Sequence, residues 1–215
     1  DQAQPARQES GGLLAFNTAA VLMIEVCNCS SRRRRTLREP LLALLFSLLP
    51  AFAAAAQPWL LVDTEVLTLT VMQDEQPQLT LHNLAIGRYG ATAEKIRGDN
   101  MTPLGRFRIT HIERDTGFHR FVGLSYPDTE RANIGRRQDD ISERELQAIL
   151  AAHRRGKAPP QNTALGGRIG IHGLGKADPR LHETMNWTRG CVALTNRQID
   201  SLLPWLHIGM TVVIR

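Results

Sequence analysis

Apolar and polar residues alternate along most of the chain after residue 58, and this alternation restricts the fold more than any other feature. In the run from Leu67 to Val71 every second side chain is apolar, which is typical of a strand with one face in a hydrophobic core. Turn residues separate such runs. We therefore predict a β-rich domain with strands at 59–65, 65–73, 79–87, 106–114, 168–173 and 211–215.

Two segments have the residue spacing of helices instead. Ser142 and Glu145 form a capping-box pattern ahead of apolar residues at helical spacing, and Gly156 is a stop signal. A shorter helix is predicted from Asn196 to about Pro204. Most of the remaining chain is predicted to be loop. One such segment contains residues that we interpret as solvated, with contacts to cell-wall carboxylates as the alternative: Tyr126, Arg131, Arg136 and Arg137.

Residues 32–56 have the composition of a secretory signal peptide. Arginines at 32–35 precede an apolar stretch, and small residues ending at Ala56 follow it. The apolar stretch is shorter than the roughly 20 residues of a membrane-spanning helix. We predict cleavage after Ala56, export to the periplasm or cell envelope, and no stable membrane anchor afterwards. Residues 1–31 are interpreted as an uncertain leader or as an artefact in the assigned start of the chain.

The charge of the remaining chain argues against nucleic acid as a partner. The net charge is +5, but six of the 26 basic and four of the 21 acidic residues precede residue 57. The other 20 basic and 17 acidic residues give residues 57–215 a net charge of +3. This excess is too small for a nucleic-acid surface, although it suits an anionic cell envelope. A nucleic-acid role for the arginines at 32–35 is the alternative to a signal peptide.

Cys191 is the only cysteine after residue 56, so the remaining chain cannot form an internal disulfide. A thiol attacks a carbonyl carbon as its thiolate, which requires a base or a neighbouring positive charge. His172, at the end of a predicted strand, and Arg189 are candidates for these groups. Gly190 permits a tight turn that would aim backbone N–H groups at an oxyanion. The alternative is a buried structural cysteine, which the polar residues just before it disfavour.

Metal binding is not expected from the spacing of candidate ligands. Nine residues separate His172 from His182, and eight separate His182 from Cys191, which matches no usual zinc site. The other histidines after residue 56 are interpreted as packing or surface residues: His82, His111, His119, His153 and His207.

Three motifs in order resemble the L,D-transpeptidases of the YkuD type. "IHG" and "WTRGCVAL" are similar to the family's His-Gly and Ser/Thr-x-Gly-Cys signature, with sixteen residues from His172 to Thr188. Upstream, "MTPLGRF" matches a Thr-Pro-x-Gly-x-Phe segment at Thr102 to Phe107. Downstream, "LTNRQID" and "GMTVVIR" resemble the closing helix and strand. The likeness covers about Trp59 to Arg215, and "GLSYP" is most similar to the branch of YafK-like envelope proteins.

The resemblance implies a fold and a set of site residues. The fold would be a β-rich sandwich or barrel with a few short helices, and residues 57–215 would form the catalytic domain. Cys191 would be the nucleophile and His172 its general base. The carbonyl of Gly173 would orient the imidazole, and the N–H groups of Gly190 and Cys191 would form the oxyanion hole. The resemblance assigns substrate contacts or support of the loop to Trp187, Thr188 and Arg189.

The resemblance also implies the chemistry and the partner. The thiolate would attack a peptidoglycan stem peptide between its third and fourth residues, and the amine of a second stem would take the acyl group from the thioester. No metal or organic cofactor takes part in such a reaction. Two departures affect substrate recognition, because Ala193 stands where many members have Arg or Asn, and Arg189 where many have His.

Three alternatives stay open from the sequence. Water can replace the amine, which would make the protein an L,D-carboxypeptidase or amidase. A wall-attached protein can be the acyl acceptor or the leaving group. A chain that has lost its catalytic geometry would be a peptidoglycan-binding module.

Overall fold

The computed structural model describes residues 57–215. The predicted leader (1–31) and signal peptide (32–56) lie outside the described residues. Within the described part, no helix combines the length and the apolar character that crossing a bilayer requires. The strands are β1 (Trp59–Asp63), β2 (Thr68–Gln73), β3 (Gln76–His82), β4 (Ala91–Thr92), β5 (Thr102–Pro103), β6 (Gly105–Thr116), β7 (His119–Leu124), β8 (Gly170–His172), β9 (Val192–Ala193) and β10 (Thr211–Ile214). The helices are α1 (Thr129–Arg137), α2 (Glu143–Arg154), α3 (Pro179–Thr184) and α4 (Asn196–Leu202), followed by a 3-10 turn (Leu203–Trp205).

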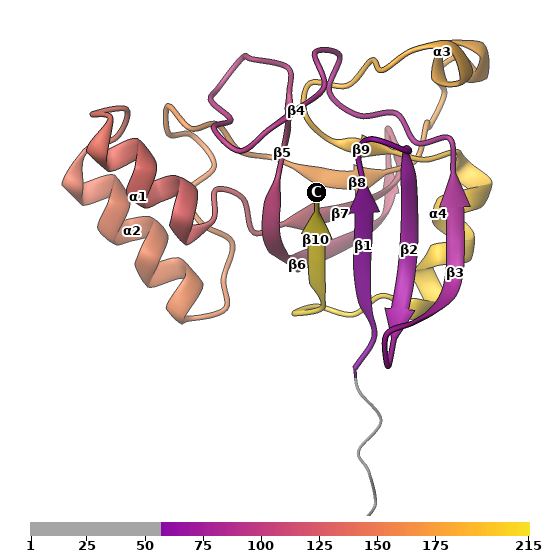
Figure 1. Cartoon of the computed structure of the whole chain (residues 1–215), viewed down its shortest axis with the longest axis horizontal. Coiled ribbons are helices and arrows are strands. Elements are labelled where there is room, and N and C mark those ends of the chain that lie inside the picture. The colour runs from indigo at the N-terminus through magenta and orange to yellow at the C-terminus, as the bar shows by residue number, and fades with distance from the viewer. Residues whose placement is uncertain (1–56) are drawn as a thin grey trace, which may run out of the picture. The chain divides into compact units, whose positions relative to one another are not determined.

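Eight of the strands form one sheet, which confirms the predicted β-rich architecture. The strand order is β3-β2-β1-β10-β6-β7-β8-β9, and β4 and β5 form a separate pair. The β1–β10 and β8–β9 pairs are parallel, and the other pairs in the large sheet are antiparallel. Figure 1 shows β10 directly beside β1, so strands from opposite ends of the described chain are neighbours.

The two edges of the large sheet meet near β8 and β9. Ala85 follows edge strand β3, and Ala193 lies in edge strand β9. Their backbones exchange two hydrogen bonds, of 3.1 Å from Ala85 N–H and 2.7 Å from Ala193 N–H. The sheet is thereby closed on itself next to β8 and β9, as expected for a sandwich or barrel.

Strand β6 shows how the predicted alternation produces a core and an outer face. Phe107 and Ile109 are buried, whereas Arg106 and Arg108 are exposed. The register with β7 then shifts between Ile109 and His111, as at a β-bulge. Alternation thus predicted the buried face correctly, but not the irregularity that changes which side chains point outward beyond residue 110.

The helices agree only in part with the sequence predictions. Helix α2 has the predicted capping box of Ser142 and Glu145. Helix α4 begins at the predicted Asn196, but the capping side chain is that of Thr195. Helices α1 and α3 were not predicted, and both begin after an aspartate that accepts a backbone N–H.

The interpretation of 126–137 as a solvated loop is wrong for the loop, since 129–137 is helix α1, and for the solvation of Tyr126 and Arg131, whereas Arg137 is exposed as expected. The Tyr126 ring is 1% exposed, and its hydroxyl donates to the carbonyls of Lys95 and Leu165 at 2.8 Å each. Arg131 is 3% exposed, and its guanidinium lies 2.9 Å from the carboxylate of Asp140. Helices α1 and α2 pack together to one side of the sheet (Figure 1) around a small core of Ala132, Ile141, Leu146, Ile149 and Leu165.

Candidate active site

Strands β8 and β9 bring His172 and Cys191 to the same region of the sheet. His172 ends β8, and Cys191 directly precedes β9. In their parallel register, Ile171 pairs with Val192 and His172 pairs with Ala193. Cys191 is two residues before Ala193, so the alternation of a strand puts its side chain on the same face as His172. With neighbouring strands about 4.8 Å apart and a rise of about 3.3 Å per residue, the two Cα atoms lie on the order of 8 Å apart.

The imidazole of His172 is held by the backbone of the next residue. Its Nδ1 lies 2.7 Å from the carbonyl oxygen of Gly173. A carbonyl oxygen only accepts hydrogen bonds, so Nδ1 carries the proton and Nε2 of the neutral ring is free to accept one. Gly173 is required here because a Cβ would lie 2.7 Å from the carbonyl oxygen of Phe118 and 2.8 Å from Oδ1 of Asn196.

Aromatic side chains surround the His172 ring. The ring centroids of Phe118 and Trp187 lie 4.4 Å and 5.9 Å from that of His172, and Phe121 stacks at 6.3 Å. His172 is only 3% exposed. This burial lowers the pKa of the imidazole below its ordinary 6.5, and the positive charge that His182 can acquire acts in the same direction. The hydrogen bond to Gly173 partly opposes the shift.

Cys191 is partly accessible and lines a cavity. The cavity has a volume of about 550 Å³, and its lining also includes Phe118, Phe121, Ile169 and Arg168. The Cys191 thiol donates a weak hydrogen bond to the carbonyl of Arg168 at 3.5 Å. Burial of the sulfur raises the pKa of the thiol to about 11, although the Gly170 backbone and the charge of Lys95 act to lower it. The thiol is therefore protonated at neutral pH.

Thr188 fixes the turn that carries Cys191. Its hydroxyl donates to the carbonyl of Cys191 at 2.6 Å and accepts the N–H of Gly190 at 3.1 Å. The residue is 3% exposed, so this side chain supports the loop and does not face a ligand. The Gly190 N–H of the predicted oxyanion hole is thus engaged by Thr188. The N–H of Cys191 makes no hydrogen bond to another described residue.

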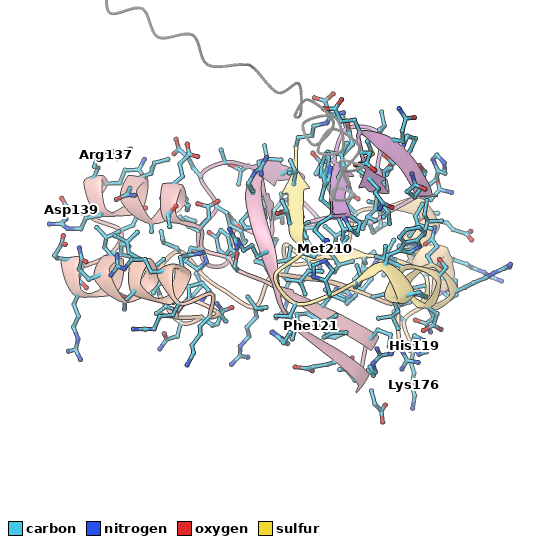
Figure 2. All side chains as sticks on the ribbon, turned by 90° about the horizontal axis from the view of Figure 1, so that it is seen from below. His119, Phe121, Arg137, Asp139, Lys176 and Met210 are labelled. Carbon is cyan, nitrogen blue, oxygen red and sulfur yellow. The ribbon has the colours of Figure 1, made fainter. Side chains whose placement is uncertain are left out.

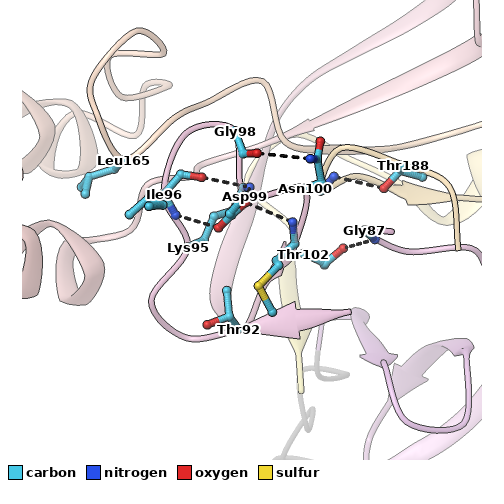
Figure 3. A network of polar contacts seen from close by, with 12 residues as sticks. Gly87, Thr92, Lys95, Ile96, Gly98, Asp99, Asn100, Thr102, Leu165 and Thr188 are labelled. Atoms are coloured by element: carbon cyan, nitrogen blue, oxygen red, sulfur yellow. Dashed lines mark hydrogen bonds and ion pairs between the residues drawn. The ribbon is translucent and has the colours of Figure 1, made fainter. Parts of the chain in front are cut away.

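A buried lysine lies behind this turn. The Lys95 side chain is 3% exposed, and its Nζ lies 2.6 Å from Oδ1 of Asp99 (Figure 3). Gly190 has a φ of +130°, and a Cβ on it would lie 3.0 Å from Nζ of Lys95. The turn can therefore approach the ammonium group because residue 190 lacks a side chain.

The segment that carries Lys95 is itself fixed by hydrogen bonds. Asp99 accepts the backbone N–H groups of Ile96 at 2.8 Å and of Met101 at 3.0 Å (Figure 3). The carbonyl of Lys95 accepts from Tyr126 and from Nε of Arg131 at 2.9 Å. These contacts tie the predicted loop 89–105 to helix α1 and hold the ammonium in place.

Other residues singled out in the sequence lie in different environments. Arg189 is exposed and makes no hydrogen bond or ion pair to a described residue. Trp187 is half-buried and lines a separate cavity of about 720 Å³ next to Asn186. Ala193 is fully buried between His172 and Ala85, so this position cannot contact a ligand. Within residues 57–215, no three His, Cys, Asp or Glu side chains are grouped so that they could hold a metal ion.

Sequence reasoning missed Lys95 and Phe118. A lysine in a Gly- and Asp-containing segment resembles a surface residue, and only the tertiary contacts bury it. The one available signal was the spacing of Lys95 and Asp99, four residues apart just before the Thr102–Phe107 motif. Phe118 lies at the tip of the β6–β7 hairpin. The sequence around it does not explain an aromatic residue there, because its contact with His172 arises only in the fold.

Comparisons with known proteins agree with this fold. The family model described as the L,D-transpeptidase catalytic domain (YkuD) matches residues 57–214. A solved structure of a mutant of the helical cell shape determining protein Pgp2 from Campylobacter jejuni is 19% identical, with a TM-score of 0.50, and the match covers 75% of this chain and 48% of that one. A mutant L,D-transpeptidase from Enterococcus faecium is 13% identical, with a TM-score of 0.43 and coverage of 74% and 50%.

The chain thus spans about half the length of these solved structures. At 19% identity, the likeness to the Pgp2 mutant concerns the fold alone. No curated protein matches the sequence. The family model, in contrast, covers nearly all of the described residues. The chain belongs to the YkuD family of L,D-transpeptidase catalytic domains.

Proposed function

We propose that the chain is an exported cysteine L,D-transpeptidase that acts on peptidoglycan stem peptides through a thioester acyl-enzyme. The observation that carries the proposal is the pairing of two groups on neighbouring strands. The Cys191 thiol lines a cavity, and the His172 ring on the same face of the sheet has its Nδ1 proton committed to Gly173. Such a pair is the basic requirement for nucleophilic catalysis by a thiol.

The first step is a proton transfer followed by attack. The resting thiol is protonated because burial raises the pKa of Cys191 to about 11. Neutral His172 takes this proton at Nε2 as the sulfur forms a bond to the carbonyl carbon between the third and fourth residues of the stem. The carbonyl oxygen becomes an oxyanion, and the backbone N–H of Cys191 is a donor that could stabilise it.

The second step releases the leaving group and completes the transfer. The tetrahedral intermediate collapses, the C–N bond breaks, and the imidazolium gives its proton to the departing amine of the terminal D-amino acid. A second stem's side-chain amine then attacks the thioester, loses its proton to Nε2 and regenerates the thiol. These steps use no metal or organic cofactor.

A product assay tests the proposal and separates it from its alternatives. The exported protein is incubated with a disaccharide-tetrapeptide, and the products are measured by mass spectrometry. A crosslinked dimer supports transfer to an amine, tripeptide alone supports hydrolysis, and no product with retained binding supports a binding module. Cys191→Ala is the control, because it removes the sulfur and must abolish every product. A wall-attached protein as acceptor or leaving group would be detected as a protein–peptide adduct or as its release.

Export is tested at the N-terminus. We propose residues 32–56 as the signal peptide and 57–215 as the mature catalytic domain. Mass spectrometry of the protein from the cell envelope would then find an N-terminus at Gln57. A protein that retains the arginines at 32–35 would contradict export by this route.

A further inference from the structure

Two cavities adjoin along the outer face of strand β6. The cavity that contains Cys191 has a volume of about 550 Å³, and the second has about 640 Å³. Thr110 lines both of them, and the consecutive residues Lys157 and Ala158 line one each. The two cavities therefore form one groove, with β6 on one side and the segment after α2 on the other. We name its two parts the thiol cavity and the basic cavity.

The basic cavity is lined by cations without partners. Arg106, Arg108, Arg154 and Lys157 are exposed, and none of their side chains makes a hydrogen bond or ion pair to another described residue. Arg131 and Arg136, on the neighbouring helix α1, instead pair with aspartates at 2.9 Å and 2.7 Å. Unpaired cations that converge on a concave surface are available to an anionic ligand.

The remaining polar lining fits the same kind of ligand. Asp128 is the only carboxylate among the residues that line the basic cavity, and its Oδ1 already accepts the N–H of Arg131 at 2.7 Å. His153 contacts the carbonyl of Pro127 through Nε2 at 2.8 Å. Hydroxyl groups of Thr129 and Ser125 provide further donors, whereas that of Thr110 already donates to the carbonyl of Gly123 at 3.1 Å. The cations outnumber the carboxylate four to one, so the cavity has a net positive charge.

We propose that the basic cavity is a binding subsite for a carboxylate of the peptide whose acyl group reaches Cys191. This inference rests on the proposed function, because it takes an acidic stem peptide as the occupant of the groove. Arginine side chains bind carboxylates through paired, charge-assisted hydrogen bonds. The thiol cavity, with Phe118, Phe121 and Leu124, would accommodate the apolar part of the same ligand.

The length of the groove agrees with such a ligand. From Arg108 to His111, which lines the thiol cavity, β6 rises by roughly 10 Å. An extended peptide of four residues spans at most roughly 14 Å. A stem peptide is therefore long enough to extend along β6 from the thiol cavity to the basic cavity.

The experiment measures binding in the full chain carrying Cys191→Ala, which cannot turn the ligand over. The probes are a disaccharide-tetrapeptide and the same compound with its carboxylates amidated. The test variant adds Arg106→Glu and Arg108→Glu. The control adds Arg137→Glu, since Arg137 is exposed and unpaired and lies at the outer end of α1, away from Phe121 in the thiol cavity (Figure 2).

We expect the double charge reversal to weaken binding of the tetrapeptide at least tenfold, and Arg137→Glu to leave it unchanged. Amidation of the ligand should weaken binding to the parent protein by a similar factor, and added salt should do so progressively. Equal binding by the test variant and its parent would overturn the subsite. So would charge-dependent binding to anionic phospholipid vesicles without any to the tetrapeptide.

The outcomes also separate this inference from the proposed function. Product formation by the wild-type chain, together with unchanged KM in the Arg106→Glu, Arg108→Glu variant, would overturn the subsite alone. Charge-dependent binding without any product would support the subsite and contradict the transpeptidase. If the double variant does not fold, Lys157→Glu is the second test variant. The subsite predicts that this single charge reversal also raises KM.

Discussion

The surroundings of His172 and of Cys191 differ although the two residues lie on neighbouring strands. His172 lies among aromatic rings, and the nearest of them, that of Phe118, belongs to the β6–β7 hairpin. Cys191 instead follows a turn whose rear side faces a buried ammonium group, that of Lys95. Burial lowers the pKa of the imidazole and raises that of the thiol, so each environment favours the uncharged form.

This difference indicates the protonation states of Cys191 and His172 before substrate binds. With the thiol pKa at about 11 and the imidazole pKa below 6.5, the free protein holds a neutral pair at pH 7 and not a thiolate–imidazolium pair. Thiolate would then form only when a bound substrate allows proton transfer. A protonated thiol is also less open to oxidation than a thiolate.

Removing the base should have the largest effect on this pair. We expect His172→Ala to slow acylation by a carbapenem about 10²–10⁴-fold, the usual contribution of a positioned general base. The measurement is the increase in protein mass with time, at pH 7. His82→Ala is the matched control, because His82 is an exposed histidine of β3. An unchanged rate in His172→Ala would show that another group takes the thiol proton.

Removing the buried charge of Lys95 should have an intermediate effect. It should change the pKa of Cys191 and not that of His172. In Lys95→Met the thiol loses a cation that lowers its pKa, so less thiolate exists at any given pH. We expect alkylation by iodoacetamide at pH 8 to be slower by about tenfold, which corresponds to one further pKa unit. The pH profile of the alkylation rate should move to higher pH.

Two further variants distinguish charge from folding in this experiment. Lys95→Met combined with Asp99→Asn removes the unpaired carboxylate that the single change would leave, and it should still alkylate slowly. Lys176→Met removes an exposed lysine and should alkylate as the wild type does. A profile that stays in place in both Lys95 variants would mean that the ammonium acts only on the structure of the turn.

Exposing the imidazole should have the smallest effect. It should change the pKa of His172 and not that of Cys191. Because burial is the main cause of the lowered pKa of His172, Phe118→Ala should raise this pKa towards 6.5. The base must be unprotonated, so the acidic limb of the acylation profile should move to higher pH, with a loss of a few-fold near pH 6. Ile208→Ala, at an exposed apolar residue, should leave the limb in place. A shift to lower pH in Phe118→Ala would contradict the role of the aromatic cover.

The sequence predicted the parts of the fold that depend on local periodicity. The strands around Leu60, Val71, Phe107 and Val212 have alternating apolar residues, and the structure buries those residues. Helix α1 escaped prediction because its buried residues are Arg131, Ala132 and Gly135, which form no apolar stripe. Its stability depends on the Arg131 contacts with Lys95 and Asp140, which bring together segments far apart in the sequence.

The candidate site was predictable only where residues act through their own chemistry. Cys191 and His172 could be proposed because a thiol needs a base, whereas the role of the Gly173 carbonyl came only from the family resemblance. Lys95 and Phe118 act through where the fold places them, and a sequence does not show that an ammonium is buried or that a ring covers a histidine. The occupation of the Gly190 N–H by Thr188 is equally a product of the folded turn.

The parallel pairing of β1 with β10 affects when the protein can finish folding. Leu60 pairs with Val212, about 150 residues later, and β10 also joins β1 to β6. During synthesis, the middle of the sheet stays incomplete until β10 has been made. Contacts this distant in the sequence slow folding, so the newly made polypeptide stays unfolded for longer.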